Sequence, residues 1–326
     1  MNVLVTGGAG YIGSHMVKLL RERGRGVVVL DDLSTGHRDA VAGARLVEGD
    51  IGDETLVSSL LAAEKIRAVI HFAAFIVVSE SVREPGKYRL NNVVKAEALL
   101  RAMRAAKVDC LVHSSTAAVY GDPQSNPIDE AHPTRPINPY GETKLEFERM
   151  LATAHAEHGL RSVSLRYFNA AGADPGGELG ERHEPETHLI PLVLQAASGR
   201  RKSLEVYGND FPTRDGTCER DYVHVSDLCE AHLRALDWLE DGGGREAINL
   251  GSGRGATVLE VIETARRETG VDIPSRHAPR REGDAAVLVA SAERAARVLG
   301  WRCSRSDLPT IIRDAWRWER RARQTP

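Results

Sequence analysis

The 326-residue sequence predicts an α/β protein built on a doubly wound parallel sheet, with a smaller, discontinuous α/β part beside it. Three observations lead to this prediction. Short apolar runs alternate with helical patterns over the first half of the chain. A glycine-rich turn separates the first run from the first helical pattern. The polar residues that stand out follow strands, and such folds bind ligands at the carboxyl ends of their strands.

The composition is that of an ordinary globular protein, with 42% hydrophobic residues, 27% charged residues and a net charge of −3. This charge gives no electrostatic reason to expect nucleic acid or an anionic membrane as a partner. The cysteines (Cys110, Cys218, Cys229 and Cys303) lack a Cys-x-x-Cys spacing, which indicates reduced thiols in a cytoplasmic protein. No apolar run is long enough for a membrane span, and a strand directly after Met1 leaves no room for a signal peptide.

The chain begins with one βαβ unit. A β-branched run at residues 2–6 leads into the glycine turn of residues 7–13, and apolar residues then recur at helical spacing over residues 12–20. The next strand, residues 27–30, ends at Asp31. A strand, glycine turn, helix, strand and terminal acid within about 30 residues are typical of the dinucleotide-binding unit of Rossmann-type folds.

Each part of this unit has its own physical role. Gly7 permits the tight turn, Gly10 lets the backbone approach a pyrophosphate, and Gly13 lets the helix pack closely on the sheet. The phosphates are expected at the helix N-terminus, where free N–H groups and the macrodipole favour anions. Asp31 is expected to accept hydrogen bonds from ribose hydroxyls and to repel a 2′-phosphate, which favours NAD over NADP. The alternative is that Asp31 caps the following loop.

The alternation continues to residue 169. Further strands are predicted at residues 44–47, 68–70, 110–116 and 162–165. Helical patterns cover residues 80–107, at least from Lys87, and the segment from Tyr140 to about His158. Asp50 follows the third strand and is expected near the adenine edge, and the small residues after the fourth strand let the backbone pass close to a cofactor.

The segment Asn138–Lys144 carries the strongest chemical signal. Pro139 suits the first turn of a helix, and Tyr140 and Lys144 lie four residues apart on one helical face. Moving the phenol pKa from about 10 to about 7 requires roughly 4 kcal/mol, which one cation about 4 Å away can supply. The strand before it ends in Ser115 and Thr116, which can present a hydroxyl. Tyr-x-x-x-Lys alone would favour a surface tyrosine with an ordinary helical neighbour, but the rest of the chain favours a tyrosine base, which we therefore predict.

After Asn169 the chain becomes rich in loops. Gly, Pro and charged residues fill residues 170–186, and a helix is predicted from His188 to near Gly199. Other predicted elements are a strand at 203–207, a polar loop at 209–217, and helices at 257–270 and in the tail from Ser291. Residues 221–225, the helix at 226–239 and the strand at 247–250 are predicted to return to the main sheet.

Two domains follow from this pattern. The predicted cofactor domain covers residues 1–169 and 221–252, and the predicted substrate domain covers residues 170–220 and 253–326. A small, discontinuous and loop-rich second domain suits a lid that binds substrate.

Three other patterns are less decisive. His183 and His188 are five residues apart with a proline between them, so one helical face cannot present both as His-x-x-x-His does, and no metal site is predicted. The sequence contains no Gly-x-Ser-x-Gly elbow, the motif that would indicate a hydrolase. Arg220, Arg280 and Arg281 could clamp a diphosphate or could be surface arginines that pair with Asp221, Glu282 or Asp284, and their spacing leaves both interpretations open.

The chain resembles the extended short-chain dehydrogenase/reductase family, and within it the UDP-sugar 4-epimerases. The resemblance begins with the order of the glycine turn, Asp31, Thr116, Tyr140 and Lys144. The resemblance covers almost the full length. It rests on the motifs at residues 10–15 (Gly-Tyr-Ile-Gly-Ser-His), 69–73 (Val-Ile-His-Phe-Ala), 119–122 (Val-Tyr-Gly-Asp), 139–144 (Pro-Tyr-Gly-Glu-Thr-Lys), 165–169 (Leu-Arg-Tyr-Phe-Asn), 220–225 (Arg-Asp-Tyr-Val-His-Val), 249–253 (Asn-Leu-Gly-Ser-Gly) and 278–284 (Ala-Pro-Arg-Arg-Glu-Gly-Asp).

The resemblance implies NAD-dependent 4-epimerisation of a UDP-hexose such as UDP-glucose or UDP-galactose through a transient 4-keto intermediate. Tyr140 is implied to take the proton of the sugar 4-hydroxyl while a hydride passes from C4 to the nicotinamide. Lys144 is implied to hold the nicotinamide ribose and lower the tyrosine pKa, and Thr116 to bind the same sugar oxygen. The family also implies a homodimer that pairs the helix ending near Lys107 with the Tyr140 helix.

The same resemblance implies two sets of ligand contacts. Expected at the cofactor are Gly7, Gly10, Tyr11, Ile12, Gly13, Asp31, Asp32, Leu33, Ser34, Asp50, Ile51, Phe72, Ala73, Ala74, Asn91, Ser114, Tyr140, Lys144 and Tyr167. Expected at the UDP-sugar are Thr116, Tyr140, Asn169, His188, Leu189, Glu205, Val206, Tyr207, Arg220, Arg281, Asp284 and Leu288. Within these sets Tyr207 is expected near the uracil, and Asn91 and Tyr167 by the nicotinamide.

Two positions depart from the family pattern. Ile76 stands where many members have a lysine that reaches the cofactor phosphates, and Leu288 stands at the gate of the sugar pocket, which implies intermediate tolerance of N-acetylated sugars. A 4-epimerase of UDP-pentoses, UDP-N-acetylhexosamines or UDP-uronic acids is the alternative. A 4,6-dehydratase is disfavoured because Ala117 and Ala118 replace its Asp-Glu pair. A non-catalytic nucleotide sensor is disfavoured because the tyrosine and the lysine are both present.

Overall fold

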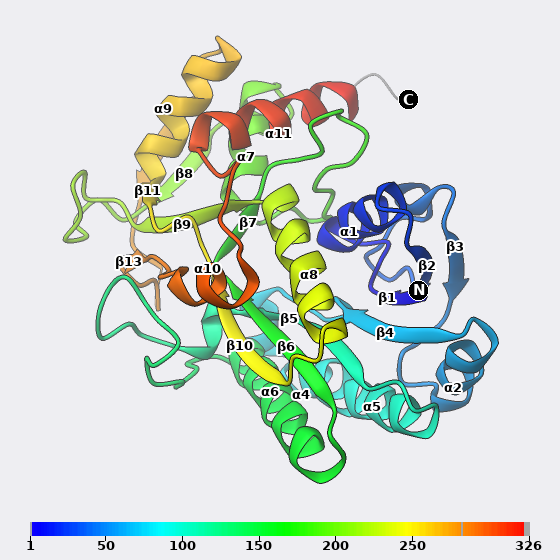
Figure 1. Ribbon diagram of the computed structural model, residues 1–326. Coiled ribbons are helices and arrows are strands. Elements are labelled where there is room, and N and C mark those ends of the chain that lie inside the picture. Colours follow the sequence, from blue (N-terminus) through cyan, green and yellow to red (C-terminus); the bar gives the residue numbers. More distant parts are fainter. Residues whose placement is uncertain (1, 282, 323–326) are drawn as a thin grey trace.

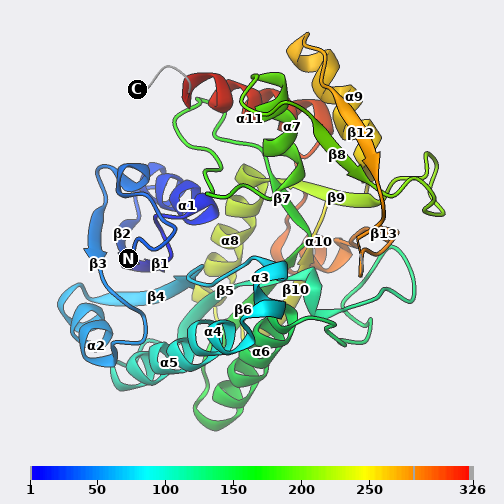
Figure 2. The same ribbon diagram turned by 180° about the vertical axis from the view of Figure 1, so that it is seen from behind.

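The computed structural model describes residues 2–281 and 283–322 of the chain. Figures 1 and 2 show a large sheet with helices on both faces and, above one end of it, a smaller part that contains α7, α9 and α11. Among the described residues, no helix combines the length and apolar character that crossing a bilayer requires.

The main sheet has seven strands, and every pairing within it is parallel. Its order is β10-β6-β5-β4-β1-β2-β3. The strands are β1 (Asn2–Thr6), β2 (Gly26–Asp31), β3 (Arg45–Glu48), β4 (Ile66–His71), β5 (Cys110–Thr116), β6 (Arg161–Tyr167) and β10 (Arg245–Leu250). The strand order reverses between β1 and β4, and a doubly wound sheet binds its ligand at that point. The predicted fold class is confirmed.

Helices cover both faces of this sheet because its strands are apolar on both sides. Along β1, Val3 and Val5 contribute to one core cluster and Leu4 to the other, as strand geometry requires. The first cluster includes residues of α1 (Tyr11–Glu22) and α8 (Val225–Glu240). The second includes residues of α2 (Glu54–Ala63), α5 (Lys95–Ala105) and α6 (Pro139–His158).

The predicted helical region at 80–107 consists of several pieces. It contains α3 (Val78–Arg83), α4 (Pro85–Arg89), a π-helical turn (Leu90–Val94) and α5. Pro85 begins α4 because a proline has no N–H to donate to the preceding turn. The π-helical turn lies where Asn91 and Asn92 face the carboxyl end of the sheet, and such turns are frequent at functional sites.

The second part contains two small sheets. One pairs β7 (Asn169–Ala171), β9 (Glu219–His224), β11 (Gly255–Thr257) and β13 (Val287–Leu288), and the other pairs β8 (Leu204–Tyr207) with β12 (Ser275–Ala278). Its core is formed mainly by α7 (Leu189–Ala197), α9 (Val258–Thr269) and α11 (Leu308–Ala322). The short α10 (Glu293–Leu299) packs instead against α8 and β10.

One sequence-based prediction about this part is wrong. Residues 221–225 were expected in the main sheet, but β9 pairs with β7, β11 and β13 in the second part. The following helix, α8, packs on the main sheet, and β10 joins that sheet beside β6. The crossover between the two parts therefore lies at the end of β9, at His224, rather than before Asp221.

Candidate active site

The start of α6 places Tyr140 against the end of β5. The Asn138 side chain accepts a hydrogen bond from the Gly141 N–H at 2.9 Å, and Pro139 occupies the first turn. A Cβ on Gly141 would lie 2.6 Å from the carbonyl oxygen of Ala118. Glycine at this position therefore lets the helix approach the turn that follows β5.

The structure brings Thr116, Tyr140 and Lys144 together. Every residue of β5 is buried, and the strand ends at Thr116, whose hydroxyl hydrogen-bonds to the Tyr140 phenol. One turn along α6, the buried Lys144 donates from Nζ to the carbonyl oxygen of Ser114 at 2.8 Å. A phenol, an ammonium group and a hydroxyl thus converge at the carboxyl edge of the sheet, a geometry suited to proton transfer.

The protonation of this pair differs from the sequence-based prediction. Burial raises the pKa of Tyr140 to about 12, and the hydrogen bond with Thr116 opposes that rise. Burial also lowers the pKa of Lys144 to about 7, and the Glu148 carboxylate opposes this change. Burial thus favours the neutral forms of both side chains, and it opposes the lowering of the phenol pKa that was expected from Lys144.

A buried network that we did not predict lies below the pair. Glu148 accepts hydrogen bonds from Ser115 at 2.5 Å and from Arg166 Nε at 2.9 Å, and Arg166 makes a second contact with the same carboxylate. Arg166 also donates to the Tyr120 hydroxyl at 3.0 Å. The signal was available, since Glu148 is four residues beyond Lys144 and therefore on the same helical face.

A second unpredicted group positions the segment after β4. The buried Asn92 accepts from the N–H of Phe75 at 2.9 Å and donates to its carbonyl oxygen at 3.0 Å. It also donates to the Thr143 hydroxyl at 3.3 Å, while Asn91 donates to the Asn92 side chain. Asn92 therefore fixes the chain after β4 against the catalytic helix, and Asn91, a predicted cofactor residue, lies at the same turn.

Tyr167 and Ser114 lie at the ends of the neighbouring strands β6 and β5, and their hydroxyl groups share a hydrogen bond. Burial raises the pKa of Tyr167 well above its usual range, so this phenol stays protonated. Through Ser114, Tyr167 lies at the carboxyl edge of the sheet near Lys144, which donates to the Ser114 carbonyl oxygen. Its phenol can donate or accept a hydrogen bond there but is not a base.

The glycine turn has the close contacts that a dinucleotide cradle needs. Gly7 has φ of +69°, and a Cβ there would lie 2.5 Å from the N atom of Ala73. A Cβ on Gly13 would lie 2.2 Å from the carbonyl oxygen of Gly7. Gly10 precedes α1, whose first turn carries no acidic residue and no side-chain cap. The first N–H groups of α1 are thus available to an anion, so the turn fits a dinucleotide diphosphate.

Asp31 lies at the end of β2, in the place expected of a ribose acceptor. Its carboxylate accepts from the N–H groups of Ala9 and Leu33, both at 2.9 Å, and burial raises its pKa. Asp31 therefore also holds the glycine turn and the loop after β2. A carboxylate has about four acceptor positions, so two of them remain for ribose hydroxyls.

The other predicted cofactor residues lie at the same edge of the sheet. They occupy the first turn of α1 or the segments that follow β2, β3 and β4, and they are Tyr11, Ile12, Asp32, Leu33, Ser34, Asp50, Ile51, Phe72, Ala73 and Ala74. Asp50 forms an ion pair with Lys95 of α5, and Ile76, which replaces the family's lysine, is 41% exposed.

Apart from Thr116 and Tyr140, the predicted substrate residues lie on the second part. Asn169 begins β7, His188 precedes α7, Leu189 begins α7, and Arg220 lies on β9. The β8 residues divide by face. Glu205 and Tyr207 point together, with the Tyr207 hydroxyl donating to Glu205 at 2.7 Å, whereas the Val206 side chain belongs to the core. Val206 can therefore offer a ligand only its backbone.

The three arginines have different surroundings. Arg281 lies over the ring of Tyr207 at 3.8 Å, and Arg220 lies 3.7 Å from the Asp284 carboxylate, so predicted substrate residues meet in pairs. Arg280 instead pairs with Asp210 at 2.5 Å. Arg280 thus forms a surface ion pair with an acid that was not predicted, whereas the predicted acid Asp284 faces Arg220. Glu282 lies outside the described residues.

Leu288 connects the second part to the catalytic helix. It lies opposite Arg220 in the β13–β9 pairing and packs on a small cluster that includes Val119, Tyr120 and Leu145. That cluster lies directly behind the turn after Thr116. The residue predicted at the sugar gate is thus held beside the catalytic groups by apolar packing.

Comparisons with known proteins agree with this geometry. The family model described as the NAD dependent epimerase/dehydratase family matches residues 3–251. A curated UDP-glucose 4-epimerase of Lacticaseibacillus casei is 50% identical over 319 residues, which cover 98% of this chain and 96% of that protein. The crystal structure of UDP-glucose 4-epimerase from Brucella ovis in complex with NAD is 50% identical with a TM-score of 0.95, covering 97% of both chains. The crystal structure of UDP-glucose 4-epimerase from Bifidobacterium longum in complex with NAD+ and UDP is 37% identical with a TM-score of 0.93, and the match covers 98% of both chains.

Proposed function

The chain belongs to the NAD dependent epimerase/dehydratase family, and from this premise we propose that it interconverts UDP-glucose and UDP-galactose by NAD-dependent 4-epimerisation. The observation that carries the proposal is the convergence of Thr116, Tyr140 and Lys144 beside the glycine turn. Relatives about 50% identical over nearly their whole length carry the name UDP-glucose 4-epimerase, which supports this activity.

NAD, when bound, supplies a hydride acceptor for the sugar C4 and a positive charge on its nicotinamide ring. The glycine turn and Asp31 are the groups that would hold it. Tyr140 takes the proton of the sugar O4 and later returns it, while the Thr116 hydroxyl holds the same oxygen. Because burial raises the pKa of Tyr140, the phenolate needs cations nearby, and Lys144 is the chain's own cation at this place.

The second part would hold the UDP group. Arg220 and Arg281 supply guanidinium groups for the diphosphate, and the Tyr207 ring offers an aromatic face to the base. Leu288 packs on the cluster of Val119, Tyr120 and Leu145, and from there it would limit the space beside the sugar. The pairing of Arg220 with Asp284 indicates that Asp284 orients that guanidinium.

The test is an assay of the purified protein with UDP-galactose and with a panel of other UDP-sugars. We expect conversion of UDP-galactose to UDP-glucose without net NADH, because the hydride returns to the same substrate. Accumulation of NADH in proportion to oxidised sugar would refute epimerisation. A kcat/KM higher for a UDP-pentose, UDP-N-acetylhexosamine or UDP-uronic acid would move the assignment to that substrate.

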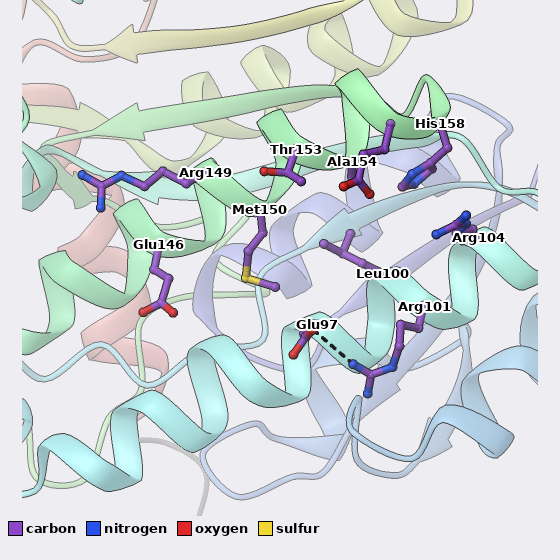
Figure 3. A pocket seen from close by; sticks show the side chains of 11 residues that line it. Glu97, Leu100, Arg101, Arg104, Glu146, Arg149, Met150, Thr153, Ala154 and His158 are labelled. Carbon is purple, nitrogen blue, oxygen red and sulfur yellow. Dashed lines mark ion pairs between the residues drawn. The ribbon is translucent and has the colours of Figure 1, made fainter.

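We further propose a homodimer that pairs α5 and α6 of two copies. Figure 3 shows a groove between these helices with Leu100 and Met150 inside it and charged side chains of both signs along its rim. A self-complementary surface of this kind suits a two-fold interface. On α3 and the π-helical turn, which pack beside α6, Val82 is 62% exposed and Leu90 is 54% exposed. Exposed apolar groups next to a groove favour an interface.

Light scattering after size-exclusion chromatography tests the dimer. Leu90→Glu is expected to give a monomer, because it places a charge in the apolar surface. Val271→Glu, at an exposed apolar position in the second part, is the matched control and should leave the mass unchanged. A wild-type protein that elutes as a monomer would contradict the proposal.

A cytoplasmic location is also proposed, since all four cysteines are free thiols.

A further inference from the structure

The loop between β7 and α7 gathers four side chains that can bind a metal ion. They are Glu181, His183, Glu186 and His188, and their ligand atoms all lie within 4.8 Å of one another. The loop, not a helix, brings the histidines side by side, with ring centroids 5.4 Å apart. The spacing argument from the sequence considered only a helical motif and therefore missed this arrangement.

Three of the distances between ligand atoms are close to those of a tetrahedral site. His183 Nδ1 lies 3.2 Å from a Glu181 oxygen and 3.8 Å from a Glu186 oxygen, and His188 Nδ1 lies 3.7 Å from the other Glu186 oxygen. His188 Nδ1 is also hydrogen-bonded directly to the Glu181 oxygen that faces His183, and an ion at the centre would replace that contact. Zinc bonds of about 2.0–2.1 Å in a tetrahedron place neighbouring ligand atoms roughly 3.3–3.4 Å apart. Small side-chain rotations therefore suffice to coordinate an ion at the centre.

We propose that Glu181, His183, Glu186 and His188 bind one divalent transition-metal ion, and that zinc is the ion that fits best. Two imidazole nitrogens and two carboxylates suit zinc better than calcium or magnesium, which prefer oxygen ligands alone. The charges also balance, because two carboxylates and one Zn²⁺ ion sum to zero when both histidines are neutral.

Burial supports a cation at this place. The side chains of Glu181 and Glu186 are each 5% exposed, and buried carboxylates require a cation or a metal beside them. Protonated histidines could supply that charge instead of a metal. The two possibilities differ in whether a divalent ion binds with a defined stoichiometry, and a binding experiment can therefore separate them.

The surroundings indicate what the metal would do. The Trp318 indole of α11 donates to the carbonyl oxygen of Glu181 at 3.1 Å, and the Tyr11 ring lies edge-on to His183 at 6.5 Å. Arg182 forms an ion pair with Asp39 at 2.7 Å, on the cofactor side. In Figures 1 and 2 the loop passes between α1 and α11. An ion in the loop would therefore fasten the second part to the glycine turn.

The experiment is a zinc titration of the full-length, EDTA-treated protein by calorimetry, with metal content measured by mass spectrometry. We expect one zinc ion per chain, a higher Tm with zinc, and visible absorption bands of tetrahedral Co²⁺ when cobalt replaces zinc. His183→Ala should weaken zinc binding by at least ~10²-fold, since it removes a ligand. His277→Ala, at an exposed histidine on β12, is the matched control and should bind as wild type.

Glu186→Gln serves as a second variant if His183→Ala does not fold. Its amide oxygen can still accept from the N–H groups of Thr187 and His188, so the loop is kept while a carboxylate ligand is lost. The proposal is overturned if no saturable binding of zinc or cobalt occurs, or if both loop variants bind zinc as tightly as wild type. Metal binding is measured without substrate, so this outcome is independent of the epimerase assay.

Discussion

Replacing Glu148 by glutamine tests whether the buried network below the catalytic pair holds it in place. Glu148 and Arg166 are each only 8% exposed, and the carboxylate also accepts from Ser115. The variant keeps the shape of the side chain and one acceptor, but it leaves the Arg166 guanidinium buried without its counter-charge. Burial alone would oppose the charged form of Arg166, and the Glu148 carboxylate is the main reason that its pKa remains high.

The size of the effect follows from this burial. Removing one partner of a buried ion pair costs about 3–5 kcal/mol, and the retained hydrogen bond to Ser115 places Glu148→Gln near the lower end. Glu146→Gln is the matched control on the same helix. Its pair with Arg89 is exposed, at 36% and 62%, and such surface pairs contribute only about 0–1 kcal/mol.

Urea unfolding of the two variants measures the difference in free energy of unfolding, and the pH dependence of kcat measures the effect on catalysis. The Glu148 carboxylate opposes the lowering of the Lys144 pKa, so Glu148→Gln should move the alkaline limb of kcat to lower pH. The control should not move that limb. The reasoning is refuted if both variants unfold with the same free energy, or if their pH profiles coincide with that of wild type.

Three further predictions follow from single contacts. Tyr140→Phe should lower kcat by at least ~10²-fold while NAD binding, measured by fluorescence quenching, persists; near wild-type turnover would exclude Tyr140 as the base. Gly13→Ala should abolish tight NAD binding because the added Cβ would lie 2.2 Å and 2.8 Å from backbone atoms. Gly86→Ala is the control: its added Cβ would meet nothing within 4 Å, so this variant should bind NAD normally in the same titration. Burial lowers the pKa of His232 to about 4. Between pH 4 and about 6.5 the unfolded chain therefore binds more protons than the folded chain, and the free energy of unfolding should fall as the pH drops through that window. His232→Phe should reduce that fall by up to ~1.4 kcal/mol per pH unit in denaturation experiments, and an unchanged pH slope would contradict a neutral buried histidine.

The strands and helices around the main sheet could be predicted because their signals are local. Most strands of the first 169 residues are short apolar runs that end at a glycine, an acid or a hydroxyl residue, and parallel strands with intervening helices leave few topologies. The placement of Tyr140 beside Lys144 was equally local, since helical spacing and the Asn138-Pro139 start fix both side chains. Such features depend on neighbours within one turn or one strand.

The misplaced β9 shows where local signals fail. Its buried residues, Asp221 to His224, resemble those of a central strand, and α8 after it packs on the main sheet. The partner strands β7, β11 and β13 are only two or three residues long, so no sequence pattern announced a second sheet. Strand pairing is a property of both partners, and here the partners were too short to predict.

The pKa of Tyr140 shows that side-chain proximity is not sufficient to predict protonation. Spacing places an ammonium beside a phenol, but the same packing that brings them together removes water from both, and desolvation changes each pKa toward the neutral form. Burial is a tertiary property, so its sign could not be taken from a seven-residue segment. Because burial opposes the phenolate, the positive charge of an oxidised nicotinamide, when bound, would add to that of Lys144 in lowering the phenol pKa. Titration of Tyr140 with and without NAD would reveal this directly, as a lower phenol pKa in the presence of the oxidised cofactor.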